Sequence, residues 1–167
     1  MAFATKWLEE RAFFPQLFQE PPDNKTGIIV VVPAFDEPGI STLLDSLVSC
    51  NEPECRVELI IIINANSSAT AESLGNNALC IRNIEHWIQK NINSFFRVYY
   101  FDAGKAPLKD WGVGLARKTG MDEALRRYNY LNNPDGLIVS LDADCTVEKN
   151  YFLALFNEFY KLRDRKA

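Results

Sequence analysis

Short stretches of β-branched and aromatic residues alternate along the chain with longer segments in which apolar residues recur at helical spacing. The short stretches lie at residues 28–32, 57–63, 97–101 and 137–141, and each is too short for a helix. They are mostly apolar instead of alternating with polar residues, a pattern typical of strands that are covered on both faces. We therefore predict an α/β fold: an open, mostly parallel, Rossmann-like sheet with helices on both faces.

Helical segments follow each of the four predicted strands. An apolar stripe over residues 43–48 predicts the first helix, which Pro38 would begin. Further helices are predicted around residues 81–88, from about 114 to 130, and from about 148 to 162. Because the predicted strands are parallel, their carboxyl ends should meet at one edge of the sheet.

The first 24 residues have a pattern of their own and precede the main domain, which we place at residues 25–167. Between residues 2 and 19 the apolar side chains fall near one helical face, and Pro21-Pro22 would end that helix. We predict an amphipathic N-terminal helix and a linker. The polar face is mixed in charge, which favours packing against protein, and peripheral docking on a membrane surface is the alternative.

The composition is that of an ordinary globular protein, and it excludes several classes of partner. The sequence has 18 Lys and Arg against 22 Asp and Glu, so it lacks the positive field that collects nucleic acid. No apolar run approaches the roughly 20 residues of a transmembrane helix. Charged residues interrupt the N-terminus where a secretory signal would be apolar, and we expect a cytoplasmic protein. The cysteines form no CxxC pair and the one histidine is His86, so no zinc site is predicted.

Polar loops follow three of the predicted strands, at the edge where open α/β sheets bind ligands. The last of these loops contains Asp142 and Asp144, a DxD spacing that lets two carboxylates converge on Mg²⁺ or Mn²⁺. A turn or a helix cap is the alternative role for this pair. The sequence has neither a GxGxxG loop nor a P-loop, so a bound phosphate would need this cation as its counter-charge, helped by Lys105 or Arg117.

Four segments occur in an order that resembles a known family. They are Pro33-Ala34-Phe35-Asp36-Glu37, the Asn- and Ser-rich turn at residues 64–68, Gly114-Leu115-Ala116-Arg117-Lys118-Thr119-Gly120 and Leu141-Asp142-Ala143-Asp144. The combination resembles the nucleotide-sugar-binding half of a family 2 glycosyltransferase with the GT-A fold, over about residues 27–162. The resemblance implies an inverting transferase that takes a nucleotide-sugar donor and Mg²⁺ or Mn²⁺. Its acceptor is unknown and would be a glycan, a lipid or a small molecule.

The resemblance also implies which loops bind the nucleoside. Pro33, Ala34 and Phe35 would border the nucleobase, and Glu37 would lie near the ribose. Asn64 would also contact the donor, and it stands where the family usually has Asp, so that an amide replaces a carboxylate beside the base. In the first segment the family usually has Asn-Glu, and this chain has Asp-Glu.

The last loop is implied to bind the diphosphate and the metal ion. Asp144 would be the metal ligand, and Asp142 beside it would approach the ribose or the donor sugar. Arg117 and Lys105 match basic residues of the family. The catalytic base and the acceptor-binding half follow the DxD motif in this family. We therefore expect the base beyond Ala167, and expect this chain to be the donor-binding part only.

Two alternatives stay open from the sequence. The segment Asp142-Ala143-Asp144-Cys145-Thr146 also resembles the DxDx[TV] motif of haloacid-dehalogenase-like phosphatases, in which the first Asp is the nucleophile and the second the acid/base. In that family the motif ends the first strand of the core, whereas here it lies close to the end of the sequence. The second alternative is a noncatalytic domain that binds a nucleotide or docks a partner.

Overall fold

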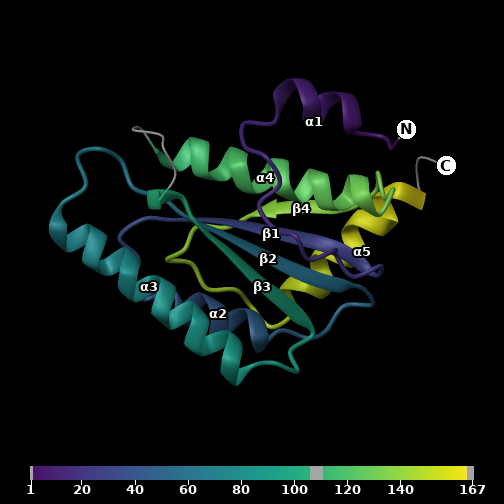
Figure 1. Ribbon diagram of the computed structural model, residues 1–167. Coiled ribbons are helices and arrows are strands. Elements are labelled where there is room, and N and C mark those ends of the chain that lie inside the picture. The colour runs from purple at the N-terminus through teal and green to yellow at the C-terminus, as the bar shows by residue number, and fades with distance from the viewer. Residues whose placement is uncertain (1, 106–110, 165–167) are drawn as a thin grey trace.

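The computed structural model describes residues 2–105 and 111–164, and it describes side chains for residues 2–104 and 111–159. Helices and strands alternate along the chain (Figure 1). In order they are α1 (Thr5–Arg11), β1 (Thr26–Ala34), α2 (Ser41–Val48), β2 (Arg56–Ile63), α3 (Ala71–Lys90), β3 (Phe96–Asp102), the 3-10 turn η1 (Ala103–Lys105), α4 (Val113–Tyr130), β4 (Leu137–Ser140) and α5 (Tyr151–Asp164).

The four strands form one parallel sheet in the order β3-β2-β1-β4, which confirms the predicted α/β fold. The central strand β1 pairs with β2 along its length and with β4 only over residues 28–31. All four carboxyl ends therefore lie at one edge of the sheet, called the carboxyl edge below. The helices lie on both sides of the sheet (Figure 1).

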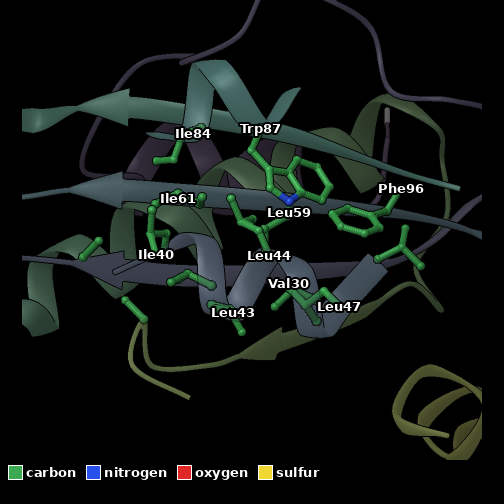
Figure 2. Close-up of a cluster of buried hydrophobic side chains, with 14 of the residues drawn as sticks. Val30, Ile40, Leu43, Leu44, Leu47, Leu59, Ile61, Ile84, Trp87 and Phe96 are labelled. Carbon is green, nitrogen blue, oxygen red and sulfur yellow. The ribbon is translucent and has the colours of Figure 1, made fainter. Parts of the chain in front are cut away.

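Alternate residues of the central strands belong to two separate hydrophobic cores. Val30 and Ile61 face α2 and α3 on one side of the sheet, where Trp87 belongs to the same cluster (Figure 2). Val31 and Ile62 face α4 on the other side. Burial on both faces explains why these strands are apolar throughout.

β1 is longer than predicted, because it continues through Pro33 and Ala34. Successive strand residues direct their backbone groups to opposite neighbours, and the carbonyl of Ala34 accepts a hydrogen bond from Asn64 on the β2 side. Pro33 therefore faces the β4 side, where strand pairing has already ended at Val31. The missing N–H of Pro33 thus costs no ladder hydrogen bond. The predicted end of this strand at residue 32 is wrong, and the chain leaves the sheet at Phe35.

The N-terminal segment forms a shorter helix than predicted and then an irregular stretch with several bends. A helix reaching residue 19 would have to pass through Pro15, which has no N–H to donate. Instead, the backbone N–H of Phe13 donates to Asp122 and that of Leu17 to Glu123, both at 3.0 Å. These two carboxylates are buried on α4, so the irregular stretch is tied to the main domain. Within the described ranges no helix has the length and hydropathy to cross a bilayer.

Candidate functional site

The loops after β1, β2 and β4 lie together at the carboxyl edge, because β1 is the neighbour of both other strands. Open α/β sheets bind ligands outside this edge. The predicted residues of the site come from the end of β1, from these loops, from η1 and from the first turns of α4. The structure therefore brings most of them to one region, although their sequence positions are far apart.

Arg117 on α4 ties the DxD segment to the end of β4. Its Nε donates to Ser140 Oγ at 2.9 Å, and its Nη2 donates to Asp142 Oδ1 at 2.8 Å. The Asp142 side chain is 63% exposed and that of Arg117 is 37% exposed. A guanidinium group can make both contacts at once because its donors form a rigid fork. Arg117 thus orients the first carboxylate of the motif through its Oδ1 atom.

The DxD segment forms a turn, but its carboxylates do not serve that turn. The backbone N–H of Cys145 donates to the carbonyl oxygen of Asp142 at 3.2 Å. Among the residues with described side chains, no backbone N–H donates to the carboxylate of Asp142 or Asp144. Both side chains are exposed. Turn formation and helix capping therefore do not explain why acidic residues stand at these two positions.

Acidic side chains from two loops are close enough to interact. Partial burial of Glu37 raises the pKa of its carboxyl group, and the negative charges of Asp144 and Asp36 raise it further. Negative charges crowded in this way favour protonation or a bound cation. The loop after β1 and the DxD loop therefore form one acidic region.

Whether a divalent cation fits this region depends on which carboxylates could coordinate it. In the part of the chain that the structure describes, no three His, Cys, Asp or Glu side chains are grouped as a complete metal site. Mg²⁺ is, however, often held by one or two carboxylates together with substrate phosphates and water. Asp144 fits that pattern, since it is exposed and its negative charge helps to raise the pKa of Glu37. Asp142 fits less well, because Arg117 already binds its Oδ1.

Asn64 lies at the carboxyl edge with its side chain directed inward. It is 4% exposed, and its Nδ2 donates to the carbonyl oxygen of Trp111 at 3.1 Å. Its Oδ1 is buried, and it has no hydrogen-bond partner among the residues that the structure describes. The amide of Asn64 therefore links β2 to the start of α4, and one acceptor atom is left over for a further donor.

The other residues assigned to the nucleoside differ in exposure. Pro33 and Ala34 are buried in β1, whereas Phe35 is half-buried where the chain leaves the sheet. Lys105 ends η1, and its side chain lies outside the described residues. A cavity of about 380 Å³ opens beside this region, between α3 and the ends of β2 and β3. It is lined by Ala65, Leu74, Asn77, Ala78, Ile81, Asp102 and Gly104.

The sequence analysis missed three polar residues of α3 that face the loop after β1. Ser73 and Asn76 donate to the carboxylate of Asp36, and Asn77 accepts from its backbone N–H. The missed signal was their spacing, because residues three and four positions apart lie on the same face of a helix. The predicted helix covered only the later apolar stripe of α3, and the sequence analysis assigned its first polar turns to no element.

Comparison with known proteins gives few matches. No family model and no curated protein matches the chain. A crystal structure of S. aureus TarS 1–349 has 16% sequence identity and a TM-score of 0.46, and the match covers 77% of this chain and 30% of that chain. A second crystal structure of S. aureus TarS has 18% identity and a TM-score of 0.44, with 78% and 19% covered. This chain is thus similar to TarS and spans less than a third of the length of each TarS chain.

Proposed function

We propose that this chain is the donor-binding part of an inverting glycosyltransferase that takes a nucleotide-sugar together with Mg²⁺ or Mn²⁺. The observation that carries the proposal is the acidic region formed by Glu37, Asp36 and Asp144. Two of the segments that resemble family 2 glycosyltransferases contribute to it. It also lies at the edge of the sheet where ligands of open α/β folds bind.

The metal ion is assigned to Asp144, with phosphate oxygens of the donor completing the coordination. A divalent cation there would supply the counter-charge for the diphosphate that leaves when the sugar is transferred. Neither carboxylate is held by a backbone donor in the described part of the chain, which supports a role in ligand binding.

Arg117 is assigned an indirect role, as the residue that orients Asp142. Its hydrogen bond to Asp142 Oδ1 leaves Oδ2 to accept a hydrogen bond from a ribose or sugar hydroxyl group. The sequence analysis assigned Arg117 to the phosphates instead. In the present proposal Lys105 keeps that assignment, together with the metal ion. Phe35, half-buried at the end of β1, supplies an aromatic ring for the nucleobase.

The phosphatase alternative has less support. The DxD segment follows β4, which lies at one end of the order β3-β2-β1-β4, and in that family the motif ends the first strand of the core. Arg117 also binds the carboxylate that would have to act as the nucleophile.

Calorimetric titration with UDP-, GDP- and other nucleotide-sugars, with and without Mn²⁺, tests the proposal. We expect one of them to bind only when Mn²⁺ is present. Asp144→Ala should abolish this metal-dependent binding, because a charged oxygen ligand is lost. Glu54→Ala is the matched control, since Glu54 is an exposed carboxylate in the loop before β2. Failure of every nucleotide-sugar to bind in a metal-dependent way would contradict the proposal.

A further inference from the structure

Asp36 has a backbone conformation that few side chains tolerate. Its φ angle is 62°, in the left-handed region where Asn and Asp are the most common residues after Gly. Its backbone N–H donates to Asn77 Oδ1 at 2.9 Å. This hydrogen bond fixes the turn that follows β1, directly between Phe35 and Glu37.

The carboxylate of Asp36 is bound by the first two turns of α3. Ser73 Oγ donates to Oδ2 at 3.0 Å, and Asn76 Nδ2 donates to Oδ1 at 2.7 Å. The N-cap residue Thr70 accepts from the backbone N–H of Ser73 at 3.1 Å, so the donors stand on a well-capped helix end. The amino end of a helix also attracts a negative charge. Both oxygen atoms of Asp36 are therefore engaged by α3.

The same contacts continue to the other loops of the site. Asn77 Nδ2 donates to the carbonyl oxygen of Asn64 at 2.9 Å, and Asn64 Nδ2 donates to that of Trp111. Asn77 and Asn64 are 8% and 4% exposed, so this part of the network is shielded from water. These hydrogen bonds run from the loop after β1 through α3 and the end of β2 to Trp111, two residues before α4.

We propose that Asp36 is a positioning residue that holds Phe35 and Glu37 in place through its contacts with Ser73, Asn76 and Asn77. The first two turns of α3 then support the donor site through Asp36. This inference rests on the proposed function, because it concerns the same site. It adds that donor affinity depends on the contacts between Asp36, in the loop after β1, and α3.

Two substitutions of Asp36 separate the side-chain contacts from the backbone turn. Asp36→Gly keeps the left-handed conformation without strain but removes both carboxylate contacts. Asp36→Asn also tolerates this conformation. Its amide can accept from Asn76 and donate to Ser73, whose hydroxyl group can turn to accept. Asp36→Asn is therefore the conservative variant that should rescue binding.

The measurement is the affinity for UDP and for GDP in the presence of Mn²⁺, together with hydrogen exchange of the backbone amides of residues 35–37 and 39. For Asp36→Gly we expect faster exchange and affinity weaker by about tenfold or more, since small displacements of binding groups are costly. For Asp36→Asn we expect affinity within about threefold of the parent chain, as a retained hydrogen-bond pair would give. The double variant Ser73→Ala/Asn76→Ala removes the same contacts from the α3 side and should match Asp36→Gly.

The outcomes separate this inference from the proposed function. If the parent chain binds neither UDP nor GDP with Mn²⁺, and binds none of the nucleotide-sugars in the titrations above, the proposed function fails and this inference fails with it. If the parent chain binds and Asp36→Gly binds equally well, the positioning role alone is overturned. Unchanged hydrogen exchange in Asp36→Gly would also overturn it, because the contacts would then not hold the loop. Additive losses when Asp36→Gly is combined with Ser73→Ala/Asn76→Ala would contradict a shared origin of the two effects.

Discussion

Charged side chains gather at both edges of the sheet, and the two groups differ in burial and in bonding. Near the amino ends of the strands, Glu58 and Arg127 are 1% and 3% exposed. Arg127 Nε and Nη2 both donate to the Glu58 carboxylate, and Thr26 Oγ1 donates to it at 3.1 Å. Arg127 also donates to the carbonyl oxygen of Glu20, and its guanidinium group lies 4.4 Å from the centre of the Tyr99 ring.

At the carboxyl edge the charges are arranged differently. Arg117 and Asp142 form an exposed pair, and the carboxylates of Glu37 and Asp144 repel each other. In the buried Glu58–Arg127 pair, every side-chain nitrogen and oxygen atom makes a hydrogen bond, and the pair joins β2 to α4. Exposed carboxylates with spare oxygen atoms are what a ligand site needs. The comparison therefore assigns the amino-edge pair to stability, and it supports the proposed binding role of the carboxyl-edge group.

The largest effect is expected from breaking the buried pair. Arg127→Met leaves the Glu58 carboxylate buried without its counter-charge, so we expect the free energy of unfolding to fall by about 3–5 kcal/mol. Urea unfolding measures this change. Mn²⁺-dependent nucleotide binding by the folded fraction should stay the same, because Arg127 lies far from the carboxyl ends of the strands.

A double variant controls this prediction. Glu58→Leu/Arg127→Met removes both charges and should regain most of the lost stability, because no unpaired buried charge remains. A double variant as unstable as Arg127→Met would show that the packing of the arginine stem, including its contact with Tyr99, carries the effect.

A smaller effect is expected at the carboxyl edge from Phe35→Ala. Because the proposed function assigns this ring to the nucleobase, its removal should weaken nucleotide binding by about 1–3 kcal/mol and leave the dependence on Mn²⁺ unchanged. Calorimetry with and without Mn²⁺ measures both quantities. A large drop in melting temperature with unaltered affinity would instead assign Phe35 to packing.

Arg117→Lys tests whether the exposed Arg117–Asp142 pair contributes less to stability than the buried Arg127–Glu58 pair. An ammonium group cannot replace the two-pronged contact with Ser140 and Asp142. Because the pair is exposed, we expect a loss of unfolding free energy of about 1 kcal/mol or less. A loss as large as that of Arg127→Met would abolish the distinction between the two edges.

The order of strands and helices could be predicted because it follows from local apolar patterns. The four strands are apolar runs that fit a sheet covered on both faces, and the structure confirms their parallel arrangement. The boundaries were less predictable. Pro33 continues β1 because its missing N–H faces the side where pairing with β4 has ended, and that depends on a neighbour far away in the sequence.

The site was predictable in its location but not in its contacts. The motif segments placed Glu37, Asp142 and Asp144 at strand ends, and the strand order brings those ends to one edge. The pairing of Arg117 with Asp142 and the contacts of Asp36 with α3 join residues separated by 25 to 41 positions. No local pattern encodes such pairs, because several polar residues on each element could serve as partner.

The smallest predicted effect concerns the titration of Glu37. Its pKa is raised above 4.5 in the folded state by partial burial and by the charges of Asp144 and Asp36. Between the unfolded and the folded pKa the folded chain binds more protons, so the free energy of unfolding decreases as the pH rises through that window.

Glu37→Gln cannot ionise and should escape this decrease. The variant should therefore gain stability over the parent chain at about pH 7, and the gain should be absent below the unfolded pKa. Urea unfolding of both proteins across this pH range measures the difference. A gain that stays constant with pH would show that the crowding of negative charge at the carboxyl edge does not destabilise the fold, and would remove one of the two contrasts between the edges.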